Sequence, residues 1–225
     1  MLLRYELMTD IHNITPVIFG LSSTSLSDEE KKLLQSKRVF GIILFTRNIC
    51  EAKQLKDLIQ EIKDYSINPD LIISIDEEGG RVTRLGKLFP PLPSARQIGD
   101  LYKKSKTEGL ALLTTTYREI AKRLQQFEIN MCYAPILDIS YPVTHDVIGD
   151  RAFSDDKEII ITLAKAAADT LLKEGIYPVI KHIPGHGLAK SDSHLELPII
   201  NKNLVELEQA DFSIFKALRL YPFAM

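Results

Sequence analysis

The densest group of side chains able to do chemistry lies between positions 181 and 194. It reads Lys-His-Ile-Pro-Gly-His-Gly from Lys181, and Asp192, Ser193 and His194 follow after a short gap. Three of the five histidines in the chain fall within it. A single histidine is more often an ordinary structural residue, but histidines gathered this closely favour a reactive site.

The spacing of Asp192 and His194 predicts a catalytic pair. With one residue between them, the carboxylate can hold one ring nitrogen, fix the tautomer and adjust the imidazole pKa for acid/base work. Pro184 and the neighbouring glycines predict an irregular turn that brings polar groups toward a substrate. The pattern resembles two members of a catalytic triad without its serine.

A second polar segment runs from Asp76 to Arg84 and reads DEEGGRVTR. Gly79 and Gly80 permit a tight bend directly after carboxylates that follow an apolar run. By itself this segment is equally consistent with a charged turn that contains internal ion pairs. Together with the histidine-rich segment it indicates one site.

The third segment, positions 147–156, contains Arg151. An isolated arginine is usually a surface residue, but a fixed guanidinium can also hold sugar hydroxyls through paired hydrogen bonds. Ser154 or Asp155 is predicted to cap the helix that follows.

The composition excludes several classes of protein. The 225 residues are 45% hydrophobic and 26% charged, which is typical of a soluble globular protein with a sizeable core. The 28 basic and 30 acidic residues give a net charge of −2, so no long-range field gathers nucleic acid or anionic lipid. We therefore expect a neutral small molecule as partner, and neither nucleic acid nor a membrane.

Neither the cysteines nor the apolar segments indicate export. Cys50 and Cys132 each stand alone in an apolar stretch, so neither a disulfide framework nor a CxxC metal site is predicted. Arg4 and Glu6 interrupt any signal-peptide core, and no segment approaches the roughly 20 apolar residues of a spanning helix. A cytoplasmic location is expected.

Short apolar runs alternate with longer amphipathic runs, as when helices connect parallel strands. The runs that predict strands are 16–19, 41–45, 71–75, 131–138 and 179–182, with the start of another at 223. The runs that predict helices are 27–37, 51–65, 106–127, 156–174 and 203–220. Ser27 and Glu30 have the spacing of a capping box, which marks the start of the first helix.

Polar residues gather where the predicted strands end, which favours an α/β fold of the (β/α) barrel type with its site at that face. An open, doubly wound sheet produces much the same pattern and stays as the alternative. The sequence has neither GxGxxG nor a Walker lysine motif, which argues against the nucleotide-binding versions of that sheet.

These segments, in this order and spacing, resemble the family-3 glycoside hydrolases, most closely the bacterial β-N-acetylglucosaminidases that recycle cell-wall sugars. The resemblance runs from about Ile14 to the C-terminus, and its most specific part is KHIPGHG followed by DSH. It implies a (β/α)8 TIM-type barrel. Residues 1–225 would then be a single N-terminal-type barrel domain, truncated at its C-terminal end.

The resemblance also implies roles for individual residues. His194 matches the family's proton donor and acceptor, and Asp192 matches its partner. Positions that hold the terminal N-acetylglucosamine carry over to five residues here: Asp76, Arg84, Arg151, Lys181 and His182. The implied substrate is a small sugar or a muropeptide, no metal or organic cofactor is implied, and the oligomeric state stays open.

The sequence departs from the family pattern at two points. Glu77 stands where a glutamine is common, which adds a possible charge beside Asp76. The family's nucleophile is an aspartate near the end of a later barrel strand, so it is expected beyond the position of Met225. Asp155 and Asp156 do not match it, because they precede the proton-transfer loop.

The implied reaction is retaining hydrolysis, with a carboxylate nucleophile and His194 as acid and then base. Since an imidazole does not repel an anion, transfer to phosphate is a variant. Two alternatives stay open: a barrel lyase or aldolase with a Schiff base on Lys181, and an inactive, truncated sugar-binding remnant.

Overall fold

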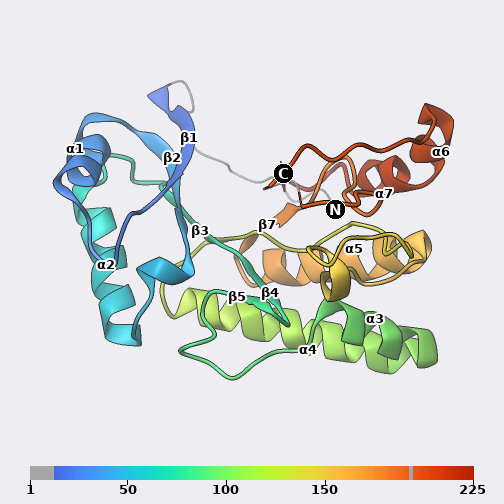
Figure 1. Cartoon of the computed structure of the whole chain (residues 1–225). Helices are drawn as coiled ribbons and strands as arrows, with labels where there is room; N and C mark the ends of the chain where they lie inside the picture. The colour runs from blue at the N-terminus through green and yellow to red at the C-terminus, as the bar shows by residue number, and fades with distance from the viewer. Residues whose placement is uncertain (1–12, 193–194) are drawn as a thin grey trace.

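The computed structural model describes residues 13–192 and 195–225. Its main feature is a curled sheet of six parallel strands in the order β1-β2-β3-β6-β7-β8 (Figure 1). The strands are β1 (Thr15–Gly20), β2 (Val39–Leu44), β3 (Ile72–Ile75), β6 (Met131–Cys132), β7 (Tyr177–Ile180) and β8 (Phe223–Ala224). The five predicted strands and the start of a sixth are confirmed.

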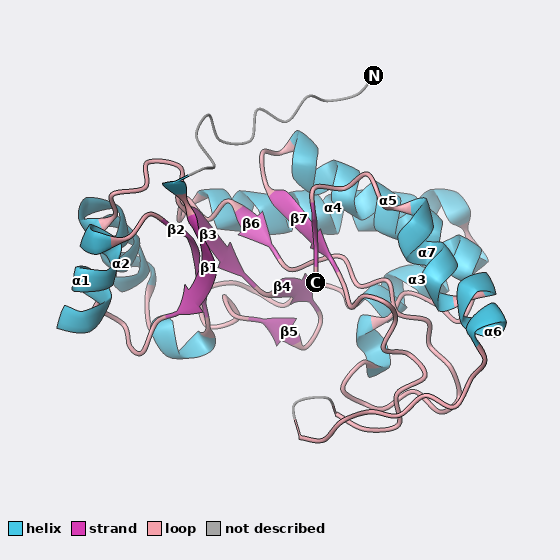
Figure 2. Cartoon of the chain, turned by 90° about the horizontal axis from the view of Figure 1, so that it is seen from above, coloured by secondary structure: helices cyan, strands magenta, loops and turns pink. Residues whose placement is uncertain are grey.

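Helices follow the strands and line one side of the sheet, from α1 and α2 at one end through α4 and α5 to α7 (Figure 2). They are α1 (Asp28–Ser36), α2 (Ala52–Tyr65), α3 (Ala95–Lys104), α4 (Lys106–Gln125), α5 (Lys157–Lys173), α6 (Leu204–Gln209) and α7 (Asp211–Ala217). Two short 3-10 turns, η2 (Thr46–Asn48) and η3 (Gly149–Arg151), lie in the connections.

Local sequence explains how the first two helices form. The Ser27 hydroxyl accepts a hydrogen bond from the Glu30 amide at 3.2 Å, and the Glu30 carboxylate accepts one from the Ser27 amide at 2.7 Å. The predicted capping box is therefore confirmed. In α2, buried leucines and isoleucines recur at spacings of three and four, so one face packs on the sheet: Leu55, Leu58, Ile59 and Ile62.

The two faces of the sheet pack differently. Because side chains alternate along a strand, Ile73 and Ile75 belong to the large core beneath the helices, whereas Ile72 points to the opposite face. That second, inner face carries a smaller cluster: Ile72, Met131, Tyr133 and Val179, with Phe40, Ile43, Tyr177 and Phe223 packed against it.

The strand order decides between the two predicted architectures. Successive parallel strands are added in one direction without a reversal, and a doubly wound sheet requires a reversal. The doubly wound alternative is therefore wrong. The sheet is a half-barrel: within the described residues it has six parallel strands, and a closed TIM-type barrel has eight.

Several boundaries differ from the prediction. Asp156, and not Ser154 or Asp155, caps α5: its carboxylate accepts hydrogen bonds from the Glu158 and Ile159 amides. The Ser154 hydroxyl instead accepts from the Asp156 amide and shapes the turn before the cap. Capping is decided by which side chain reaches the free amides, and several neighbouring residues had the right chemistry.

The predicted helix over 203–220 is two helices. At Ala210 the backbone leaves the helical region (φ −112°, ψ −99°), and Asp211 begins α7 with its side chain 3% exposed. The Tyr141 hydroxyl donates to Asp211 at 2.8 Å. The apolar periodicity continues through this break, so only the tertiary contact distinguishes the two helices.

The predicted strand over 131–138 forms ladder pairs only at Met131 and Cys132, with one further bridge between Ile136 and Lys181. Pro135 has no amide to donate, which explains the interruption. Two elements were not predicted: α3, and the hairpin of β4 (Glu77–Gly79) and β5 (Val82–Thr83). In the described part of the chain, every helix is too short or too polar to span a bilayer.

Candidate active site

Lys181 lies at the centre of a charged network at the carboxyl ends of the strands. It directly follows β7, and its side chain is 1% exposed. The ammonium contacts Asp76, which follows β3, at 2.8 Å, and Glu78 on β4 at 2.6 Å. Since β3 and β7 both pair with β6, the sheet order brings these distant segments together.

Asp76 has a second cationic partner. Arg84 donates to its other carboxylate oxygen at 3.2 Å. Burial by itself raises the pKa of Asp76, but the charges and hydrogen bonds of Lys181 and Arg84 outweigh it, so the pKa lies below its ordinary value. Asp76 is therefore a carboxylate at neutral pH and can accept hydrogen bonds from a ligand.

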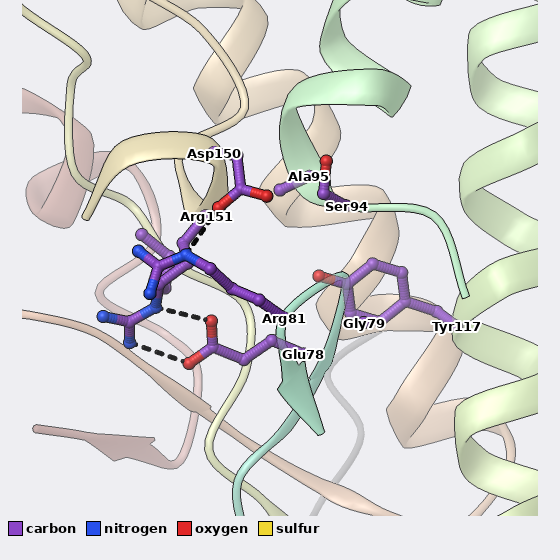
Figure 3. A pocket seen from close by; sticks show the side chains of 9 residues that line it. Glu78, Gly79, Arg81, Ser94, Ala95, Tyr117, Asp150 and Arg151 are labelled. Carbon is purple, nitrogen blue, oxygen red and sulfur yellow. Dashed lines mark hydrogen bonds and ion pairs between the residues drawn. The ribbon is translucent and has the colours of Figure 1, made fainter. Parts of the chain in front are cut away.

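Arg151 binds the same network through Glu78. Its Nε and Nη2 atoms each donate to a Glu78 oxygen at 2.9 Å, the paired geometry that gives such contacts their strength (Figure 3). Burial lowers the pKa of Arg151, but Glu78 outweighs that effect and the pKa lies above its ordinary value. Glu78 thus joins Arg151 to Lys181.

His182 makes a contact of a different kind. Its Nδ1 lies 2.6 Å from Asp138 Oδ2, and the His186 amide donates to Asp138 Oδ1 at 2.7 Å. Asp138 is fully buried. A carboxylate at Nδ1 fixes the tautomer and leaves Nε2 of His182 for another partner.

All five predicted sugar-holding residues lie in this connected region. Asp76 contacts both Arg84 and Lys181, Arg151 joins Lys181 through Glu78, and His182 follows Lys181 in the chain. Arg84 and Lys181, which belong to distant segments, share Asp76 as a partner. The role of these residues in binding sugar stays a prediction.

Of the two residues in the predicted proton-transfer pair, the structure describes only Asp192. His194 lies outside the described residues, so its contact with Asp192 stays a prediction. Asp192 is described and is half-buried in the loop between β7 and α6. The Leu195 and Glu196 amides both donate to its backbone carbonyl, at 3.0 and 3.1 Å.

Glu78 and Asp138 are the two network residues that were not singled out from the sequence. Each had a signal. Glu78 belongs to the DEEGG segment, and Asp138 ends the apolar run from position 131. A carboxylate at a strand end that is buried must have a partner, so both positions predicted a contact without identifying it.

Glu77, the departure from the family pattern, does not contact Lys181. Its carboxylate accepts from the Thr83 hydroxyl at 2.6 Å and from the Arg84 and Leu85 amides at 2.9 and 3.1 Å. It therefore shapes the turn that carries Arg84. Burial raises the pKa of Glu77 despite these hydrogen bonds.

Replacing Glu77 by glutamine is expected to stabilise the protein, and more so at pH 8 than at pH 5. A carboxyl whose pKa is raised on folding loses stability as pH rises from its ordinary value of 4.5, and an amide does not titrate. The glutamine oxygen can accept from the two amides, and its NH2 group can donate to Thr83. Urea unfolding of both proteins across this range measures the difference. A constant difference would show that Glu77 titrates as it does in the unfolded chain.

Next to Glu78 and Arg151 lies a small cavity, lined also by Ser94 and Tyr117 (Figure 3). Its free volume of about 10 Å³ suits one water molecule and not a sugar ring. This cavity is therefore too small to hold the sugar. Within residues 13–192 and 195–225, no group of three or more histidine, cysteine or acidic side chains could hold a metal ion.

The arrangement provides fixed hydrogen-bonding groups for a polar, uncharged ligand. Three cations and the carboxylates of Asp76 and Glu78 hold one another in place, so both donors and acceptors are oriented before a ligand arrives. Oriented donors and acceptors of this kind suit a molecule with many hydroxyls.

Comparison with known proteins gives a consistent result. Residues 9–219 match the family described as "Glycosyl hydrolase family 3 N terminal domain". A protein named "Beta-hexosaminidase" from Neisseria meningitidis serogroup A is 38% identical over 207 residues, which are 90% of this chain and 56% of the relative. The namesake from Thioalkalivibrio sulfidiphilus is 36% identical over 195 residues, 87% of this chain and 56% of its own length. The chain thus spans little more than half of these relatives.

A solved structure shows the same similarity. It is titled as NagZ from Neisseria gonorrhoeae in complex with N-trifluoroacetyl-D-glucosamine. It superposes with a TM-score of 0.87 at 35% sequence identity, over 95% of this chain and 62% of that one. The curled sheet and its helices therefore have the fold of that protein.

Proposed function

The chain belongs to glycosyl hydrolase family 3, and from this we propose that it recognises terminal, non-reducing β-N-acetylglucosamine and takes part in its retaining hydrolysis. The observation that carries the proposal is the network of Asp76, Lys181, Glu78 and Arg151 at the strand ends, with Arg84 on its rim. A solved relative with 35% identity is titled with a bound glucosamine derivative, which supports the sugar class.

The network suits the proposed recognition. Asp76 accepts hydrogen bonds from sugar hydroxyls, while Arg84, Lys181 and Arg151 donate to them, and His182 donates or accepts through Nε2. Because these side chains are held by one another, little of their freedom remains to be lost when the sugar binds.

In the proposed mechanism His194 protonates the leaving oxygen while an aspartate attacks the anomeric carbon and forms a glycosyl-enzyme. His194 then removes a proton from water, which releases the sugar with retained configuration. Asp192 orients the imidazole. The attacking aspartate matches no position among these 225 residues in the family order, and we place it in the strands that complete a (β/α)8 barrel.

The contacts of Lys181 argue against the Schiff-base alternative. A Schiff-base lysine must attack a carbonyl with a free, neutral amine. Here the Lys181 ammonium is the ion-pair partner of two carboxylates, Asp76 at 2.8 Å and Glu78 at 2.6 Å. We assign it the role of a fixed positive charge.

We further propose a cell-wall fragment, such as a muropeptide, as the natural substrate, and the cytoplasm as the place of reaction. The lack of strong net charge fits an uncharged sugar as the recognised group. Cys50 and Cys132 are both free thiols, as a reducing compartment requires.

The test compares two proteins on 4-nitrophenyl N-acetyl-β-D-glucosaminide. The full-length protein that contains this chain is expected to hydrolyse it, whereas residues 1–225 alone should bind N-acetyl-D-glucosamine without turnover. The corresponding β-glucoside, which lacks the acetamido group, is the control substrate. Failure of the full-length protein to bind N-acetyl-D-glucosamine would overturn the proposal, and turnover by residues 1–225 would place the nucleophile within them.

A further inference from the structure

Arg81 makes several hydrogen bonds to the loop that carries Arg151. Arg81 lies in the turn between β4 and β5. Its Nε donates to the Asp150 carboxylate at 2.8 Å, and its Nη2 donates to the backbone carbonyls of Asp146 and Val147, the latter at 3.1 Å, with the Ile148 carbonyl at 3.4 Å as a longer contact. One guanidinium thus contacts backbone carbonyls and the Asp150 side chain of the same loop, and Figure 3 shows the Arg81–Asp150 contact.

Arg151, on the loop, makes a second connection by donating hydrogen bonds back to the hairpin. This residue ends η3 of the loop and donates to Glu78 on β4. Its Nη1 also donates to the Val147 carbonyl at 2.6 Å, so Val147 accepts from both arginines. The position of Arg151 therefore depends on the backbone segment that Arg81 holds.

Besides the buried side chain of Ile148 and the packing of η3 on α3, the other hydrogen bonds of the loop are mostly internal. The Val147 amide donates to His145 Nδ1, and the Ile148 and Gly149 amides donate to the His145 carbonyl, all within the loop. The His145 amide reaches the Ala189 carbonyl at 3.4 Å, which is a long hydrogen bond. Among the described residues, Arg81 provides the most extensive hydrogen bonding from the sheet side.

We propose that Arg81 is a positioning residue, which holds loop 146–150 so that Arg151 is oriented on Glu78 before sugar binds. The inference rests on the proposed function. An exposed ion pair such as Arg81–Asp150 contributes little stability, because solvent screens it. Charged hydrogen bonds to several carbonyls define geometry, and misplacing a binding group by about 1 Å is costly to its function.

The test measures binding of N-acetyl-D-glucosamine by calorimetry in the full-length protein. Arg81→Ala is expected to raise Kd about tenfold through the loss of an oriented Arg151. Arg81→Lys should give an intermediate Kd, since an ammonium keeps the charge but cannot reach both sides of the loop as a fork. Asp150→Asn keeps the carbonyl contacts and should change Kd less than Arg81→Ala.

A double variant separates positioning from a general structural role. If Arg81 acts through Arg151, then adding Arg81→Ala to Arg151→Ala should raise Kd no further. Arg118→Ala is the matched control, because Arg118 is as exposed and pairs with Glu174 away from the site. Urea unfolding checks that each variant is folded.

The outcomes are distinguishable. Loss of N-acetyl-D-glucosamine binding in the unaltered protein counts against the proposed function. If that protein binds and Arg81→Ala leaves Kd unchanged, or if the two substitutions add independently, the positioning role is wrong.

Discussion

Replacing Lys181 by methionine is expected to destabilise the protein by about 3–5 kcal/mol, a large part of the stability of a typical domain. Methionine has nearly the length of lysine, so the packing of the chain is largely kept. What is lost is the charge that faces Asp76 and Glu78 at 2.8 and 2.6 Å.

The size of this effect follows from burial. Removing one partner of a buried ion pair leaves the other charge without compensation in a medium that solvates it poorly. Here a single side chain, 1% exposed, faces two carboxylates. After the substitution, Arg84 still pairs with Asp76 and Arg151 still pairs with Glu78. Because neither carboxylate is left without a cation, the expected loss is no larger than that for one broken buried ion pair.

Urea unfolding at pH 7 measures the loss, with Lys53→Met as the matched control. Lys53 also forms an ion pair, with Asp57, but its side chain is 80% exposed and solvent screens the pair, so the same substitution should change the free energy of unfolding far less. Equal effects at the two sites would contradict the buried network.

The Lys181→Met deficit is also expected to depend on pH. A carboxylate whose pKa is lowered on folding contributes stability above its ordinary pKa of 3.8, and that contribution is lost as pH falls through the folded value. Lys181 lowers the folded-state pKa of Asp76 and burial raises it, so removal of Lys181 raises that pKa, and the difference between the two proteins should shrink as pH falls through the higher pKa of the variant toward the lowered pKa of the unaltered protein. A deficit that stays constant with pH would assign the loss to packing.

In the full-length protein, His194→Ala is expected to lower kcat by about 10²–10⁴ while sparing the affinity for N-acetyl-D-glucosamine. A general acid acts when the leaving oxygen takes up charge, so its removal affects the transition state more than the bound sugar. Asp192→Ala should lose part of the same factor, because it removes the group that orients the imidazole.

The leaving group provides the internal control for this prediction. A nitrophenolate needs no proton to depart, so the first step on the nitrophenyl substrate should suffer less than the same step on a sugar leaving group. Pre-steady-state release of nitrophenolate, compared with cleavage of a disaccharide, measures the two. Equal losses for both substrates would remove His194 from the acid role.

What the sequence by itself determined is local. The capping box at Ser27 and the apolar face of α2 involve residues within a few positions, so their pattern is complete in a short window. The polar segments that follow apolar runs predicted where the site lies, because parallel strands place their carboxyl ends together. The segments that contain Asp76, Arg84 and Lys181 were identified in this way, and the resemblance to the family pointed to these three residues within them.

The tertiary structure decided which side chains meet. Lys181 contacts Asp76, which is 105 positions away in the sequence, and Arg151 contacts Glu78, which is 73 positions away. The order of strands decides these pairs, and no short window contains both partners. For the same reason Glu78 was not recognised as the residue that joins two cations.

Tertiary contacts also decided details that local chemistry left open. Two α-helices stand where one was predicted: the backbone leaves the helical region at Ala210, and Asp211, which begins the second helix, accepts a hydrogen bond from Tyr141, 70 positions away. In the sequence Arg81 is one more charged residue of DEEGGRVTR. Only the folded structure brings loop 146–150 close enough for Arg81 to donate hydrogen bonds to it. Propensity and spacing list the groups that could interact, but burial and the packing of distant segments select the interactions that form.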